Sequence, residues 1–378
     1  MFGRRFPLFS VAGINIGVDV SWFLIAFLLS WTLAVGYFPF YYPKFTAGSY
    51  WIMGISGMLG LFISIILHEL GHALTAKKFN VPISEITLFV FGGVAQLKHE
   101  PPSPKAEFLV AVAGPIVSVF ISVFMSFITG WGKSLELSSM ITGVTAYLAM
   151  INMVVVVFNL IPAFPLDGGR IFRALLWWWK DDLGWATTIT SKIGSGFGFF
   201  LIFMGFFTLL TGNIFVGMWW IILGLFLQQA ASLSKTQYYV RHELEGERVE
   251  RYMIKDPITI PPTITLKEFL DDYVFRSFHH LYPVVEEKEL RGYVTLTEVK
   301  SIDHDKWSEV TVEDVLVPLD EIKTVSEETQ ALEALNIFQE TNASTLLVAD
   351  GKTLKGMLTA QDLYKLISIK IDLETSTR

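Results

Sequence analysis

The sequence LFISIILHELGHALTA, residues 61–76, is the clearest single indication of how the first half of this chain folds. It is an apolar, helix-forming run interrupted by His68, Glu69 and His72. Helix positions i and i+4 lie one turn apart on the same face, so both imidazoles are expected to point at one metal ion. Glu69 lies about 100° round the helix, where its carboxylate is placed to act as a general base toward water on that metal. The alternative is a pair of hydrogen-bonded structural histidines beside a helix-end glutamate. It is disfavoured because three ionisable groups in one turn of an apolar span are costly in lipid.

Zinc is the predicted metal. The chain has no cysteine, so a metal site must be built from His, Asp or Glu. Zinc accepts nitrogen and oxygen ligands, and a catalytic zinc keeps three protein ligands and one open position. Asp167 is the predicted third ligand, because the prolines and glycines of 159–169 break a later apolar stretch into a sharp turn. A simple Asp-Gly turn is the alternative use of this residue.

The first 232 residues are predicted to form an α-helical polytopic membrane unit. They carry 12 Lys plus Arg and 9 Asp plus Glu, whereas residues 233–378 carry 17 and 27. Overall 52% of residues are hydrophobic and 17% charged, which excludes a disordered or nucleic-acid-coating protein. Crossing a bilayer takes roughly 20 apolar residues. Six stretches meet that length: 18–39, 51–76, 106–130, 139–160, 193–211 and 213–232.

Loop charges predict the orientation. Lysine and arginine are concentrated in alternate loops, and the positive-inside rule then places both termini and the acidic tail in the cytoplasm, with the helices in the plasma membrane. Residues 83–91 and Val11–Val20 are strand-like. We expect them to pair near the cytoplasmic interface, because an unpaired strand cannot face lipid. Residues 168–179, with three tryptophans, predict a short interfacial helix.

His68–His72 on one span and Asn159–Gly169 on a later one resemble the site-2 protease family of intramembrane zinc metalloproteases, peptidase family M50. Gly92-Gly93 and Gly114-Pro115 add to the resemblance. It implies one zinc ion bound by His68, His72 and Asp167, with Glu69 as the catalytic acid and base. It also implies that Asn159 stabilises the oxyanion or orients the site.

The acidic tail has the composition of a soluble α/β protein. A charged, helix-prone connector at 233–249 is followed by a weak internal repeat, in which Gly292-Tyr-Val-Thr295 matches Gly356-Met-Leu-Thr359. The repeat resembles a tandem pair of CBS domains, which we place at 250–307 and 308–370, followed by a short tail at 371–378.

The CBS resemblance implies an adenine nucleotide, ATP or AMP, contacted by Thr359 and Asp362 and by Thr295 in the first copy, where Glu298 replaces the aspartate. A helix N-cap is the alternative role for these threonines. CBS pairs also imply a homodimer. The acidic balance of the tail argues against a nucleic-acid partner.

The combined resemblance implies an endopeptidase that cuts single-span membrane proteins in or next to their transmembrane segments. Because an α-helix shields its carbonyls, we expect the strand at 83–91 to hold an opened substrate by β-augmentation. The alternatives are a CBS-regulated transporter and a metal-binding membrane protein without catalysis. The transporter is disfavoured because no paired discontinuous helices mark a midplane site.

Overall fold

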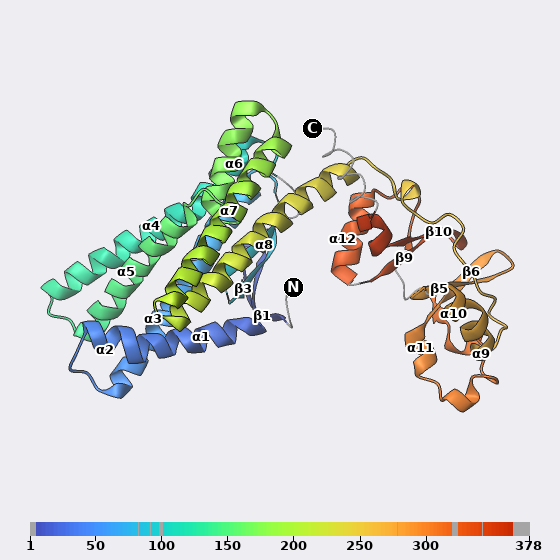
Figure 1. The fold of residues 1–378 in the computed structure, drawn as a ribbon, viewed down its shortest axis with the longest axis horizontal. Coiled ribbons are helices and arrows are strands. Elements are labelled where there is room, and N and C mark those ends of the chain that lie inside the picture. Colours follow the sequence, from blue (N-terminus) through green and yellow to red (C-terminus); the bar gives the residue numbers. More distant parts are fainter. Residues whose placement is uncertain are drawn as a thin grey trace. The chain divides into compact units, whose positions relative to one another are not determined.

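The computed structural model describes residues 5–81, 83–90, 92–97, 101–277, 279–319, 324–341 and 343–365. The chain divides into two compact units, Met1–Lys235 and Thr236–Arg378. Figure 1 shows both units, with labels on many of their elements.

The first unit is a helical membrane fold. Among the described residues, six helical segments are long and apolar enough to cross a membrane. They are Val20–Tyr41, which comprises α1 (Val20–Thr32), the π-helical turn Leu33–Tyr37 and α2 (Phe38–Tyr41), then α3 (Ala47–Lys78), α4 (Pro104–Ser134), α5 (Ser139–Asn159), α7 (Leu183–Leu210) and α8 (Ile214–Leu244). A shorter helix, α6 (Asp167–Lys180), lies where the interfacial helix is predicted. The polytopic fold class is therefore confirmed.

Two of the predicted spans differ in length from the helices. The fifth was expected to begin at 193, but α7 begins at Leu183. The first turns of α7 were not predicted because Thr187 and Thr190 are polar residues, although both are fully buried in the structure. The sixth was expected to end at 232, but α8 continues to Leu244. The predicted helix-prone connector is thus helical as far as Leu244 and continues α8.

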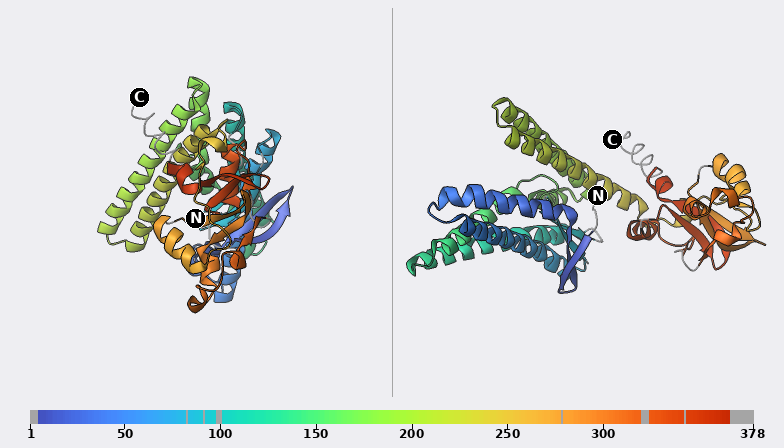
Figure 2. Two further views of the ribbon diagram at one scale, coloured as in Figure 1. Left: turned by 90° about the vertical axis from the view of Figure 1, so that its right-hand side faces the viewer. Right: turned by 90° about the horizontal axis from the view of Figure 1, so that it is seen from below.

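A four-stranded sheet, with the order β1-β2-β3-β4, accompanies the helices. Its strands are β1 (Arg5–Val11), β2 (Ile14–Asp19), β3 (Ile83–Phe89) and β4 (Gly92–Leu97). β2 runs parallel to β3, whereas the pairs β1–β2 and β3–β4 are antiparallel. The β1–β2 hairpin lies at the end of the helix bundle where α1 begins (Figure 2).

The expected single strand Val11–Val20 was wrong in extent. Ala12 and Gly13 both have positive φ and turn the chain between β1 and β2. The predicted strand 83–91 corresponds to β3, which ends at Phe89, and a further strand that was not predicted, β4, begins at Gly92. Residues of β2 and β3, among them Ile16 and Ile86, are buried against Leu70 and Ala73 of α3. The sheet therefore packs against the part of α3 that carries the histidine motif.

The second unit contains two three-stranded sheets, as expected of a tandem repeat. One has the order β5-β6-β7, formed by Leu281–Glu286, Glu289–Thr295 and Val317–Pro318. The other has the order β10-β9-β8, formed by Thr353–Thr359, Thr345–Asp350 and Thr324–Val325. The helices are α9 (Leu266–Glu268), a π-helical turn (Phe269–Val274), α10 (Phe275–Ser277), α11 (Leu296–Lys300) and α12 (Ala331–Thr341), and the described residues 360–365 are helical as well. Short 3-10 turns lie at Val249–Arg251, His304–Lys306 and Glu313–Val315.

The repeats are joined by strand exchange. Ile254, near the start of the first repeat, bridges to Met357 of β10 in the second repeat, while β7 of the second repeat pairs with β6 of the first. A Cβ atom at Gly356 would lie 2.6 Å from the Ile254 carbonyl oxygen, and one at Gly292 would lie 2.1 Å from that of Val317. The glycine of each Gly-x-x-Thr segment is thus required by a closely approaching backbone.

The end of α8 belongs to the second unit. Val240 and Leu244 are buried in one hydrophobic core with Leu335 and Phe338 of α12. This packing explains why the polar sequence after 232 remains helical.

Candidate metal centre

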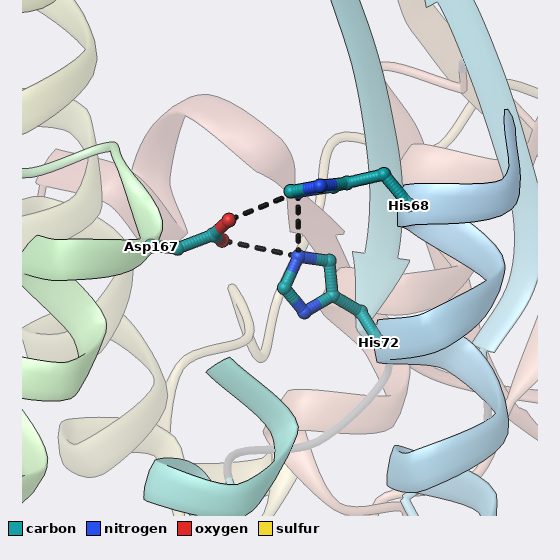
Figure 3. A group of neighbouring side chains, drawn as sticks. All are labelled: His68, His72 and Asp167. Atoms are coloured by element: carbon teal, nitrogen blue, oxygen red, sulfur yellow. Dashed lines mark hydrogen bonds and ion pairs between the residues drawn. The ribbon is translucent and has the colours of Figure 1, made fainter. Parts of the chain in front are cut away.

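Two histidines and one aspartate converge in the first unit. In the described part of the chain, His68, His72 and Asp167 are the one group of three side chains whose ligand atoms all lie within 4.8 Å of one another. Nε2 of His68 is 3.0 Å from Oδ2 of Asp167, and Nε2 of His72 is 3.2 Å from Oδ1. The two Nε2 atoms are 3.1 Å apart. Figure 3 shows the carboxylate facing both rings from the opposite side.

Separate elements supply these groups. His68 and His72 lie one turn apart in the last third of α3, and each is 4% exposed. Asp167 is the first residue of α6, at the end of the predicted turn. A Cβ atom at Gly168 would lie 2.3 Å from the Leu160 carbonyl oxygen, so this turn folds back too tightly for a side chain there.

The two imidazoles act on the charge of Asp167. Burial raises the pKa of this carboxyl, but the neighbouring charge and hydrogen bonds of His72 and His68 lower it more. Its pKa therefore lies below the ordinary range.

The geometry fits a zinc ion. Zinc–nitrogen and zinc–oxygen bonds of about 2.0–2.1 Å in a tetrahedron place ligand atoms about 3.3 Å apart. The measured separations of 3.0–3.2 Å are close to that value. Gly114 of α4 borders the same point, where a Cβ atom would lie 2.2 Å from Nε2 of His72 and 2.6 Å from Nε2 of His68. The space at the three ligand atoms thus depends on the absence of a side chain at Gly114.

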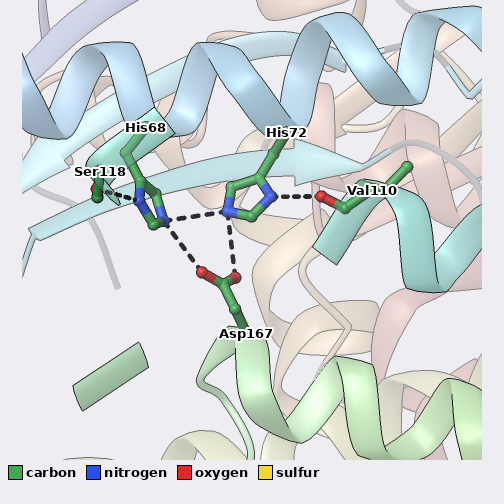
Figure 4. A network of polar contacts seen from close by, with 5 residues as sticks. All are labelled: His68, His72, Val110, Ser118 and Asp167. Atoms are coloured by element: carbon green, nitrogen blue, oxygen red, sulfur yellow. Dashed lines mark hydrogen bonds and ion pairs between the residues drawn. The ribbon is translucent and has the colours of Figure 1, made fainter. Parts of the chain in front are cut away.

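α4 also forms a hydrogen bond with Nδ1 of each ring, a contact that was not predicted from the sequence. Nδ1 of His72 is 2.7 Å from the carbonyl oxygen of Val110, and Nδ1 of His68 is 2.9 Å from Oγ of Ser118 (Figure 4). Val110, Gly114 and Ser118 are spaced four residues apart and so share one face of α4. The recurrence of a glycine and a serine at this spacing is the sequence signal from which that face could have been found.

Glu69 lies against the sheet. It is half-buried, and a Cβ atom at Gly93 of β4 would lie 2.8 Å from its Cγ and 3.2 Å from its Oε1. The backbone of β4 therefore passes directly beside the predicted acid and base. A larger residue at position 93 would displace the Glu69 carboxylate.

A buried ion pair positions α6. The Arg173 guanidinium donates to Oε1 of Glu107 on α4 through Nε at 2.6 Å and Nη2 at 2.5 Å, and its Nη1 is 3.4 Å from Oγ1 of Thr187 on α7. Its Cζ lies 5.2 Å from the ring centroid of Phe164, in the turn before Asp167. Arg173 thus ties α6 to α4 and α7, two turns from the aspartate.

The remaining predicted site residues lie apart from this cluster in sequence and element. Asn159 is the last residue of α5 and half-buried, and its part in catalysis stays a prediction. In the second unit Oγ1 of Thr359 accepts from the Asp362 N–H at 3.0 Å and donates to Oδ2 of Asp362 at 2.6 Å. Thr295 forms a capping box with Glu298. Both threonines therefore act as helix caps, and their contact with a nucleotide stays a prediction.

Known proteins share this architecture. The model of "Peptidase family M50" matches residues 56–139 and 128–205, and that of "CBS domain" matches 249–305 and 312–369. "Putative zinc metalloprotease Rip3" of Mycobacterium tuberculosis is 31% identical over 369 residues, which cover 96% of this chain and 93% of that protein. A zinc metalloprotease of Methanocaldococcus jannaschii is 31% identical, with 82% of this chain and 84% of that protein covered. The solved structure "Site-2 Protease from Methanocaldococcus jannaschii" is 28% identical, covers 61% of this chain and 95% of that chain, and has a TM-score of 0.42.

Fold and site define a multi-pass membrane protein with a His–His–Asp cluster and a C-terminal CBS pair. The chain belongs to peptidase family M50, and of two relatives that match it over most of their length one is named "Putative zinc metalloprotease" and the other a zinc metalloprotease.

Proposed function

We propose that the chain is an intramembrane zinc endopeptidase that hydrolyses peptide bonds in or next to the transmembrane segments of single-span substrates. The observation that carries the proposal is the convergence of His68, His72 and Asp167 between helices of the membrane unit, with Glu69 beside them. Three ionisable groups are costly in such a place unless they serve a site. The Lys- and Arg-rich loops support a cytoplasmic site in the plasma membrane.

The chain's own residues divide the chemistry between them. A zinc ion, when bound by the three ligands, supplies a Lewis acid and brings the pKa of a coordinated water to about 7. Glu69 takes the proton from the attacking water and delivers it to the leaving amine. Asn159, at the end of α5, supplies a side-chain amide to the developing oxyanion. His68, His72 and Asp167 do not exchange protons in this scheme.

The substrate is proposed to bind along β4, which corrects the expectation from the sequence. The predicted strand became β3, but β3 has β2 on one side and β4 on the other, so it offers no free edge for β-augmentation. Within the described residues, β4 is an edge of the sheet, and its Gly93 lies against Glu69. An extended peptide added at this edge would carry its backbone past the acid and base.

Proline scanning of β4 tests this binding mode. Val94 and Ala95 are successive residues of the ladder, so one N–H points at β3 and the other at the free edge. Proline at the position whose N–H points at the free edge breaks no bond to β3, so that variant should keep the thermal stability of wild type. We expect this variant, which is either Val94→Pro or Ala95→Pro, to bind zinc and fail to cleave. Normal cleavage by both variants would exclude β4 as the substrate strand.

We further propose that adenine nucleotide at Thr359, Asp362 and Thr295 modulates cleavage, and that the CBS pair mediates a homodimer. Both proposals rest on the two CBS-family segments of the second unit. The acidic charge of that unit argues against a nucleic-acid partner.

The direct test is a cleavage assay with purified full-length protein and a panel of single-span peptides. We expect internal cleavage that a zinc chelator abolishes and added zinc restores, with a rate that changes when ATP or AMP is added. Zinc bound without cleavage of any peptide would instead support a non-catalytic metal-binding membrane protein.

A further inference from the structure

Among the described residues of α4, Ser118 is the only one whose side chain forms a hydrogen bond with His68 or His72. We infer that Ser118 is a positioning residue that presents His68 to the metal. The inference rests on the proposed zinc site and concerns a residue of α4, a helix that contributes no ligand.

The hydrogen bonds set which ring nitrogen faces the ligand cluster. A backbone carbonyl only accepts, so the bond from His72 to the carbonyl of Val110 requires the proton on Nδ1 and leaves the Nε2 lone pair free. For His68 the partner is a hydroxyl, which accepts in the same way when the proton is on Nδ1. Ser118 thereby fixes the ring orientation that turns Nε2 of His68 toward the ligand cluster, and it accepts the Nδ1 proton in the tautomer in which Nε2 is a ligand.

The surroundings of Ser118 make this contact specific. Ser118 is 1% exposed and His68 is 4% exposed, so bulk solvent does not reach Nδ1 and the hydroxyl is its hydrogen-bond partner. Without the hydroxyl, the His68 ring loses the bond that fixes its orientation and is free to take the proton on Nε2, the atom that faces Asp167. Loss of such an outer partner of a ligating histidine costs about 10- to 100-fold in metal affinity.

A general packing role is the competing explanation, and α4 provides a matched control for it. Ser122 lies one turn further along the same face, is 4% exposed, and donates from Oγ to the carbonyl oxygen of Ala149 on α5 at 2.7 Å. It makes no recorded contact with the ligand cluster. If small buried hydroxyls on α4 serve only helix packing, S118A and S122A should behave alike.

The test measures zinc affinity of the full-length protein in detergent by competition with a chromophoric chelator, and the visible spectrum after apo-protein is loaded with Co²⁺. We expect S118A to weaken zinc binding about 10- to 100-fold and to alter the Co²⁺ bands. We expect S122A to match wild type in both readouts. The thermal midpoint of each apo-protein reports any change in folding separately from the metal.

The possible results separate this inference from the proposed function. Equal zinc affinity and equal Co²⁺ spectra for wild type, S118A and S122A would overturn the role of Ser118 while leaving the zinc site in place. Equal weakening by S118A and S122A would likewise overturn it in favour of packing. Failure of wild type to bind zinc would overturn the proposed function and this inference together.

Discussion

Nε2 of His68 lies 3.0 Å from Oδ2 of Asp167, although 99 residues separate them in the chain. Four further elements intervene between α3 and α6, so this contact exists only when α3 and α6 are brought together by the fold. The two halves of the ligand set are therefore expected to depend on each other.

Removal of either half should abolish stable zinc binding. Loss of an outer hydrogen-bond partner of a ligand weakens metal binding about 10- to 100-fold. H72A and D167A each remove a ligand itself, so we expect both to weaken zinc binding by more than that. The measurement is zinc content by elemental analysis after gel filtration, with chelator competition for the residual affinity. Full zinc occupancy in D167A would show that Asp167 is a turn residue and not a ligand.

Gly114 is predicted to be essential for reasons of space. In G114A the new methyl group would lie 2.2 Å from Nε2 of His72, so we expect the zinc content of the purified protein to fall to near zero. G130A is the matched control, because it lies on the same helix with nothing within 4 Å of its Cβ position, and alanine favours a helix over glycine by about 1 kcal/mol. Zinc retained in G114A would contradict the arrangement of α4 against the two rings.

The Glu107–Arg173 pair is expected to stabilise the membrane unit. Both side chains are buried, so R173M leaves a carboxylate in a low-dielectric site, and such losses typically cost about 3–5 kcal/mol. The readout is the thermal midpoint of the purified protein in detergent. The double variant E107L/R173M removes both charges, and we expect it to recover much of the loss. A midpoint for R173M equal to that of wild type would count against a structural role for this pair.

Thr359 is expected to have two roles, as a helix cap and as a nucleotide contact, and T265A is the control that separates them. We expect T359A to lose about 1 kcal/mol of helix-cap stability and about 3- to 10-fold in ATP or AMP affinity by calorimetry on the full chain. Thr265 forms the same kind of capping box with Glu268 but lies outside the Gly-x-x-Thr segments, so T265A should lose stability alone. Identical nucleotide affinity in T359A and T265A would show that Thr359 is only a helix cap and does not contact the nucleotide.

Much of the membrane unit was predictable from sequence because lipid imposes a simple requirement. A spanning segment must satisfy its backbone internally and be apolar over about 20 residues, and α3, α4 and α5 meet both conditions plainly. α7 was underestimated at its start because Thr187 and Thr190 are polar residues buried between helices, a property of tertiary packing that a hydropathy window does not register. The Ala12-Gly13 turn was missed because the strand-like sequence pattern continues without a break across these two residues.

The candidate site was predictable where a residue type carries the chemistry. His68, His72 and Asp167 stand out because charged groups are rare in apolar helices. The contact of His72 with the carbonyl of Val110 was not predictable, since every residue has a carbonyl. Nor was the place of β4 beside Glu69, because strand order depends on contacts distant in sequence.

Glu69 is the residue whose substitution tests the proposed reaction most directly. Glutamine keeps the size of the side chain and removes its ability to take a proton, while the three ligands remain. Zinc content and peptide cleavage should be measured together on wild type and E69Q. We expect one zinc per chain in both proteins and cleavage in wild type alone. Cleavage by E69Q at the wild-type rate, with zinc bound, would contradict the assignment of Glu69 and with it the proposed hydrolytic centre.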